Sequence, residues 1–195
     1  MPHITRGSLM SLEAYSKARL RFRERVMEHK KKRIVHVGSN VTLLFEDELT
    51  IRYQVQEMLR VERIFDDEEI SAELDAYNPL VPDGANWKAT MLIEYTEEQE
   101  RRVMLSQLIG IEDRVWVQVK GFSRVYAIAD EDLERETDDK TSAVHFLRFE
   151  LESAMVSALK NGAELAVGID HPHYLALVDP VDPVVTASLT GDLIA

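Results

Sequence analysis

Apolar residues recur every three or four positions in two stretches of the first third of the chain. In residues 11–33 they are Leu12, Tyr15, Ala18, Phe22 and Val26, and in residues 46–64 they are Ile51, Val55, Met58 and Leu59. This spacing places apolar side chains along one face of a helix. We therefore predict two amphipathic helices there, followed by a third over residues 68–78 that Asp66 or Asp67 can cap.

Shorter apolar runs bounded by turn residues predict strands. They cover residues 34–37, 41–45, 88–95, 114–119, 123–129 and 163–169. Only three residues, Lys120-Gly121-Phe122, separate the fourth run from the fifth, which favours a hairpin. Thr96 and Gln99 have the spacing of a capping box and predict a helix after them. Residues 130–140 form a charged connection in this interpretation.

Strands follow strands as well as helices, so the chain does not show a regular βαβ alternation. We predict an α+β fold, with an antiparallel or mixed sheet and packed helices, preceded by an N-terminal helical arm. The expected organisation is a basic helical arm over residues 1–32 and a single α+β domain over residues 33–195.

The stretch KTSAVHFLRFEL, residues 140–151, is compatible with two structures. As a strand, it places His145, Leu147 and Phe149 on one face, and a helix starting near Ser153 then ends at Gly162. As a helix, it is capped by Thr141 or Ser142 and continues to Gly162. The period alone does not decide between them. The density of bulky aromatic residues and the second cap at Ser153 favour the strand.

This choice decides whether His145 and His171 can meet. A long helix followed by a returning strand would bring the two imidazoles near each other. A strand followed by a crossover helix makes the two strands parallel, and the imidazoles then lie on the order of 15–25 Å apart. We expect the second arrangement, with His145 and His171 at opposite ends of neighbouring strands.

Composition narrows the classes of function. The chain of 195 residues is 45% apolar and has no cysteine, which excludes thiolate metal sites, cysteine-ligated clusters and cysteine nucleophiles. No apolar run reaches the roughly 20 residues that span a bilayer, and the N-terminus lacks a signal-peptide layout, so we predict a cytoplasmic protein without a membrane segment. The oligomeric state stays open.

Charge is distributed unevenly along the chain. The net charge of −12 repels phosphate backbones, which argues against nucleic acid as a partner. Residues 11–33 nevertheless hold nine Lys and Arg against three Glu, a surplus of six positive charges that leaves −18 on the rest. This basic arm either lies on its own acidic body or binds an acidic partner, and solvated charge runs favour the first interpretation.

Two groups of residues are candidates for a functional site. His145, Asp170 and His171 could bind Zn²⁺ or Fe²⁺, against the alternative of a hydrogen-bonded core histidine and a polar turn. A ligand pocket is predicted from one face of the second helix together with the segment around His145. Its residues are Tyr53, Gln56, Glu57, Arg60, Arg63, Lys140, His145 and Arg148, which could equally form surface ion pairs.

Several blocks resemble a bacterial family called domain of unknown function 3501 (DUF3501). They are VTLLFEDELTIRYQVQEMLRVERI, ELDAYNPLVP, YAIADEDLERE, KTSAVHFLRFEL and GIDHPHY, which together span most of the chain from about Arg33 to Tyr174. The residues that match the family pattern include Glu57, Arg60, His145, Asp170 and His171, but the resemblance assigns them no reaction.

The resemblance implies a cellular context instead. Members are often encoded beside a rubrerythrin-like protein and an Fe–S oxidoreductase related to heterodisulfide reductase. We therefore expect an accessory binding or adaptor protein of a cytoplasmic redox or peroxide-stress system, with one of these two proteins as its partner. The alternative is a metal-dependent enzyme that uses His145, His171 and Asp170.

Overall fold

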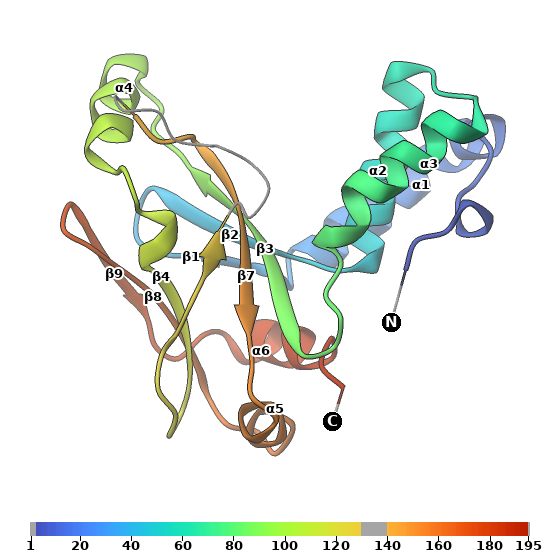
Figure 1. Cartoon of the computed structure of the whole chain (residues 1–195). Coiled ribbons are helices and arrows are strands. Elements are labelled where there is room, and N and C mark those ends of the chain that lie inside the picture. Colours follow the sequence, from blue (N-terminus) through green and yellow to red (C-terminus); the bar gives the residue numbers. More distant parts are fainter. Residues whose placement is uncertain (1–2, 130–139, 195) are drawn as a thin grey trace.

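A computed structural model describes residues 3–129 and 140–194. Figure 1 shows two lobes joined as a V, one of helices and one of sheets. The predicted charged connection over residues 130–140 lies outside the described residues, except for Lys140. None of the described helices is long and apolar enough to cross a bilayer.

The helical lobe contains α1 (Leu12–Lys30), α2 (Glu48–Glu62) and α3 (Asp67–Tyr77), with the short turns η1 (Arg6–Ser8) and η2 (Asn78–Leu80). Its helices share a hydrophobic cluster of their own: Ile4, Leu9, Ile51, Val55, Leu59, Ile70, Leu74 and Val81. The three helices confirm the prediction made from the apolar spacing, and Ser11, Asp47 and Asp66 cap their first turns. The division into residues 1–32 and 33–195 stays a prediction.

The other lobe is built from two antiparallel sheets. The five-stranded sheet has the order β1 (Ile34–His36), β2 (Val41–Glu46), β3 (Asn86–Ile93), β7 (Val144–Glu150) and β6 (Ile128–Ala129). The four-stranded sheet has the order β5 (Val125–Tyr126), β4 (Val115–Val119), β8 (Leu165–His171) and β9 (Tyr174–Val178). With α4 (Glu98–Gln107), η3 (Glu112–Arg114), α5 (Ser153–Lys160) and α6 (Pro183–Thr190), they confirm the α+β fold.

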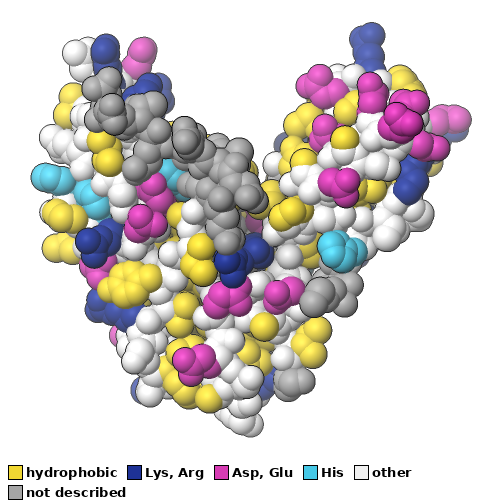
Figure 2. Space-filling model, in the orientation of Figure 1, with side chains coloured by type: hydrophobic (Ala, Val, Ile, Leu, Met, Phe, Trp, Pro, Cys, Tyr) yellow, Lys and Arg dark blue, Asp and Glu magenta, His cyan; other side chains and the backbone are white. Residues whose placement is uncertain are grey.

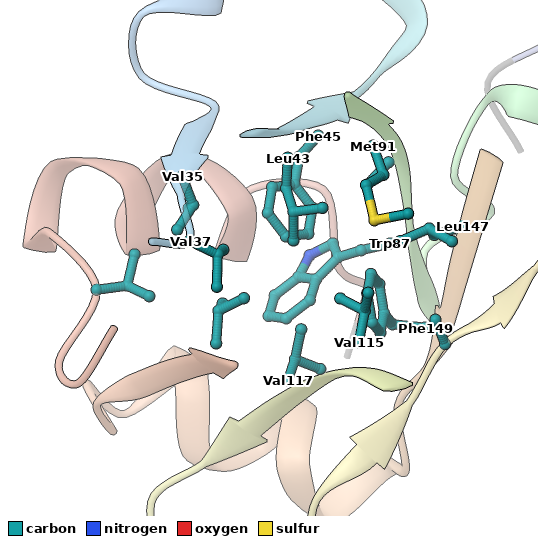
Figure 3. Packing of buried hydrophobic residues seen from close by; sticks show 14 of the residues in the cluster. Val35, Val37, Leu43, Phe45, Trp87, Met91, Val115, Val117, Leu147 and Phe149 are labelled. Carbon is teal, nitrogen blue, oxygen red and sulfur yellow. The ribbon is translucent and has the colours of Figure 1, made fainter. Parts of the chain in front are cut away.

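The main core lies between the two sheets (Figure 3). Phe45 and Phe149 of the five-stranded sheet contact each other, and Phe45 also meets Trp87 edge-on with ring centroids 6.0 Å apart. The Trp87 Nε1–H donates to the carbonyl of Leu189 at 2.9 Å, which ties α6 to this core. These three aromatic residues all belong to the five-stranded sheet, and their contacts add to the burial of their surface. Val115 and Val117 of β4 pack in the same cluster, so it is the shared burial that holds the two sheets together (Figure 3).

Two structural expectations for residues 140–151 have different outcomes. Residues 144–150 form a strand, and His145, Leu147 and Phe149 share its buried face, as predicted. The expectation that β7 and β8 are parallel neighbours is wrong, because they belong to different sheets. The helix α5 between them carries the chain from one sheet to the other instead of returning it to a neighbouring position.

The predicted capping box of α4 is also wrong. The N-cap is Glu97, one residue after Thr96, and no side chain caps this helix. The predicted hairpin is confirmed, since β4 pairs antiparallel with β5, although the run divides at Ala127 and β6 joins the other sheet.

Candidate functional site

Glu57 of the predicted ligand pocket attaches α1 to α2. Its two carboxylate oxygens accept hydrogen bonds at 2.7 Å from Arg19 Nε and NH2, and Oε1 also accepts one at 2.6 Å from the Tyr15 hydroxyl. Arg60 adds a longer contact at 3.3 Å. Arg19 first, and then Tyr15 and Arg60, lower the pKa of Glu57 to about 2 in spite of burial. Glu57 is therefore ionised at neutral pH, where it holds α1.

Gln56 serves the same attachment. Its side chain is buried and clamps the backbone of Met10, accepting from Met10 N at 2.7 Å and donating to Met10 O at 3.3 Å. The ring of Tyr53 contacts that of Phe22 on α1 at an angle of 51°, with centroids 6.0 Å apart, and Arg63 ends α2 in the left-handed conformation. Tyr53 and Gln56 thus contact the arm, and the prediction that these residues share a pocket with His145 stays a prediction.

His145 lies at one end of the main core, fully buried. Its Nε2–H donates to the carbonyl of Ser142 at 3.0 Å, with Thr141 Oγ1 at 2.9 Å. Oε2 of the buried Glu112 is 3.8 Å from the same nitrogen. Arg148 points from the opposite face of β7 and pairs with Glu150, while Lys140 is exposed. The three residues of this segment therefore face different surroundings.

His171 and Asp170 point to opposite faces of β8. The His171 Nε2–H donates to the carbonyl of Ile109 at 3.0 Å, and Nδ1 accepts from the backbone N–H of His173 at 3.2 Å, so both ring nitrogens are used. His145 belongs to the other sheet. Within residues 3–129 and 140–194 no group of three His, Asp or Glu is placed to hold a metal ion. Zinc or iron binding stays a prediction, which elemental analysis tests.

Asp170 instead belongs to a polar cluster on the outer face of the four-stranded sheet. Its Oδ2 accepts from the Tyr126 hydroxyl at 2.6 Å and from Arg124 NH1 at 3.3 Å. The Arg124 guanidinium lies 3.9 Å above the ring of Trp116, in a cation–π contact. Strand pairing fixes this arrangement, because Trp116 faces Tyr126 on β5 and Gly168 on β8.

Gly168 allows the Trp116 ring to lie flat on the sheet. A Cβ at this position would come within 2.2 Å of Trp116 Cζ2, closer than two carbon atoms can approach. The ring is consequently buried at the centre of the outer face, although none of the helices within residues 3–129 and 140–194 covers that face.

The cluster opens into a surface cavity of about 320 Å³. Its lining combines Trp116, Arg124 and Asp170 with Leu175 and Leu177 of β9. Leu175 is 77% exposed and Leu177 is 60% exposed. On the lobe of sheets, at the left of Figure 2, apolar side chains lie beside charged ones. Two atoms at the site, Trp116 Nε1 and Asp170 Oδ1, are buried without a hydrogen-bond partner in the part of the chain that the structure describes. We call Trp116, Arg124, Asp170, Leu175 and Leu177 together the Trp116 site.

Sequence reasoning found Asp170 but missed Trp116 and Arg124. A signal was present, because a glycine inside a strand, such as Gly168 in ELAVGID, often marks a close approach of another group. The group that approaches is on a strand about fifty positions earlier in the chain, and only the pairing of β4 with β8 reveals it.

Comparisons with known proteins agree with this architecture. The model of a family described as "Protein of unknown function (DUF3501)" matches residues 3–193. A crystal structure at 1.90 Å resolution of a protein of unknown function from Burkholderia pseudomallei K96243 is 59% identical, with a TM-score of 0.94. The match covers 99% of this chain and 100% of that one. No curated protein matches.

Proposed function

We propose that this chain, which belongs to the DUF3501 family, is an adaptor that binds a peptide segment of a partner protein at the Trp116 site. The observation that supports this most directly is the pair of buried atoms without partners, one a donor and the other an acceptor. A peptide group carries a C=O for Trp116 Nε1–H and an N–H for Asp170 Oδ1. A partner backbone, or the amide of Asn or Gln, therefore has the matching chemistry.

Energetics favour occupation of the site. A buried polar atom without a partner costs about 1–3 kcal/mol, and one amide group would satisfy two of them. Arg124 covers the ring and must move aside, which costs on the order of 1 kcal/mol for an exposed cation–π contact. Its side chain is 45% exposed, so its ion pair with Asp170 adds roughly 0–1 kcal/mol to that cost. The two hydrogen bonds, about 2–6 kcal/mol, thus offset the roughly 1–2 kcal/mol of moving Arg124, and the apolar contacts of the interface must supply the cost of association.

The residue types support a protein as the ligand. Trp, Tyr and Arg are the residues that most often dominate the binding energy of protein interfaces. The exposed Leu175 and Leu177 beside them supply apolar surface for an aliphatic side chain of the partner. Trp116, Tyr126 and Arg124 would form the centre of the interface, with the two leucines at its border.

The family resemblance suggests the partner. It implies an Fe–S oxidoreductase or a rubrerythrin-like protein encoded nearby, and thus an accessory role in a cytoplasmic redox or peroxide-stress system. The adaptor itself supplies no cysteine for a cluster, because the chain contains none. It would position the partner, and the partner would carry the redox centre.

Capture from a native host tests this function. Tagged wild-type protein should recover one of the two named partners, identified by mass spectrometry. Trp116→Phe keeps a flat ring but removes Nε1–H, and the loss of one hydrogen bond should weaken binding by about tenfold. The affinity of each variant for the recovered partner is then measured by titration calorimetry.

Lys120→Ala is the matched control, because Lys120 is exposed at the far end of the same sheet and pairs only with Glu164 among the described residues. It should bind like the wild type. Recovery of neither partner, or equal affinity of Trp116→Phe and the wild type, would contradict the proposal.

A further inference from the structure

The edge of the four-stranded sheet at β9 is unprotected. Of the strands that the structure describes, only β8 pairs with β9. The strand reads Tyr-Leu-Ala-Leu-Val and contains none of the charged or proline residues that usually prevent pairing at an edge. Its second backbone edge is therefore available to another strand.

This edge is held in a fixed position. The hydroxyl of Tyr174 donates to the carbonyl of Val37 at 2.8 Å and accepts from the backbone N–H of Asn40 at 3.0 Å. Gly38 lies directly against the same hydroxyl, where a Cβ would come within 2.6 Å of it. The turn between β1 and β2 thus fixes β9, and pairing would cost little ordering of the strand.

We propose that two copies of the chain associate by pairing β9 with β9, antiparallel, about a two-fold axis at Ala176. The two four-stranded sheets then become one sheet of eight strands. Ala176 lies opposite itself, Leu175 opposite Leu177, and Tyr174 opposite Val178. In this register all five residues of each strand are paired.

The residues that flank β9 limit the length of the pairing. Pro172 and His173 form the turn between β8 and β9, because His171 pairs with Tyr174, so pairing starts at Tyr174. Pro180, two residues after Val178, has no backbone N–H to donate, so pairing also stops soon after Val178. A shift of the axis from Ala176 to Leu175 or Leu177 leaves one end of each strand unpaired.

The exposed leucines gain partners from this association. Leu175 and Leu177 share the outer face, and the two-fold axis creates two Leu175–Leu177 contacts across the new strand pair. The net charge of −12 on each copy opposes association at long range. We therefore expect a dimer that dissociates on dilution. The inference does not depend on the proposed function, although pairing would bring two Trp116 sites onto one sheet.

Cysteine cross-linking tests the register directly, since the chain has no native cysteine. Opposed residues of antiparallel strands have Cα atoms roughly 4.5–5.5 Å apart, within disulfide range. Two copies of the same residue at 175 or at 177 would be roughly 8 Å apart, which is too far. A mixture of Leu175→Cys and Leu177→Cys should therefore cross-link, and neither variant alone should.

Leu20→Cys on α1 is the control for random collision, because Leu20 is 78% exposed like Leu175. Under mild oxidation the mixture should form roughly tenfold more covalent dimer than Leu20→Cys. Equal yields would overturn the proposal, and cross-linking of Leu175→Cys alone would overturn the register. Sedimentation equilibrium of the unmodified protein provides a second measurement: a dimer population that rises with concentration supports the proposal, and a monomer at high micromolar concentration overturns it.

Discussion

At the scale of single residues, the contact of Gly168 with Trp116 has the sharpest consequence. Gly168→Ala would place a methyl group 2.2 Å from Trp116 Cζ2, so the ring or the strand must move. Overpacking of this kind costs about 1–3 kcal/mol of unfolding free energy. Urea unfolding measures the loss. The same variant should bind the partner more weakly, because displacement of the ring alters the Trp116 site.

Gly7→Ala is the control for this substitution. The nearest atom to a Cβ at Gly7 is 3.9 Å away, an ordinary contact, so its unfolding free energy should stay within about 0.5 kcal/mol of the wild type. If the unfolding free energies of Gly168→Ala and Gly7→Ala were equal, β8 would accommodate the added methyl group without loss of stability, which would contradict the prediction.

At the scale of elements, the docking of α1 on α2 depends on pH through Glu57. Arg19, Tyr15 and Arg60 lower the pKa of Glu57 from 4.5 to about 2. A carboxyl group with a lowered pKa in the folded state stabilises the fold above pH 4.5, and this stabilisation is lost as the pH falls through about 2. Stability should therefore decrease over that interval partly because Glu57 becomes protonated.

Glu57→Gln isolates this contribution. At neutral pH it should lower the unfolding free energy by roughly 1–2 kcal/mol, since the pair with Arg19 is charged but partly screened. Between about pH 5 and pH 2 the variant should lose less stability than the wild type, as measured by urea midpoints at each pH. Glu13→Gln, which removes an exposed pair with Lys17, is the control and should follow the wild type.

Elements with a clear period were predictable from the sequence, and their pairing was not. The stripes of α1 and α2 and the cap at Asp66 depend on neighbours within a few residues, which the sequence displays directly. The assignment of β7 and β8 to different sheets depends on partners far along the chain: β3 for β7, and β4 for β8. The error at Thr96 has a local origin, because the N-cap is the next residue, Glu97, and the helix begins one residue later than predicted.

At the scale of the whole molecule, the dependence on partners far along the chain also explains why the sequence identified only part of the candidate site. The polar residues of α2 look like a pocket wall in the sequence, but Gln56 and Glu57 bind the arm, whose position the sequence does not show. Asp170 was found because it lies beside histidines, while its real neighbours, Arg124 and Tyr126, lie on or next to a two-residue edge strand. Residue type identified one member of the cluster, and tertiary structure supplied the others.

The two lobes meet at Arg33, which is 1% exposed and binds groups from three parts of the chain. Its guanidinium donates to the carbonyls of Phe45 and Glu46 at the end of β2. It also pairs with both oxygens of Asp192 near the C-terminus, and NH1 lies 3.6 Å from Asp47, the N-cap of α2. Loss of this side chain should therefore weaken the connection between the helical lobe and the sheets.

Arg33→Met leaves the half-buried carboxylate of Asp192 without its cation and removes the guanidinium beside Asp47, which keeps its contact with His29. The loss should be about 3 kcal/mol of unfolding free energy, the lower end of the cost of breaking a buried ion pair. In the double variant Arg33→Met, Asp192→Leu one of these carboxylates is removed, so the double variant should be more stable than the sum of the two single losses predicts. Urea unfolding of the three proteins measures this coupling. Lys31→Met, at an exposed pair with Glu28, is the control and should change stability by about 0–1 kcal/mol. Strictly additive losses would contradict the role of Arg33, because charges that share one buried network cannot contribute independently.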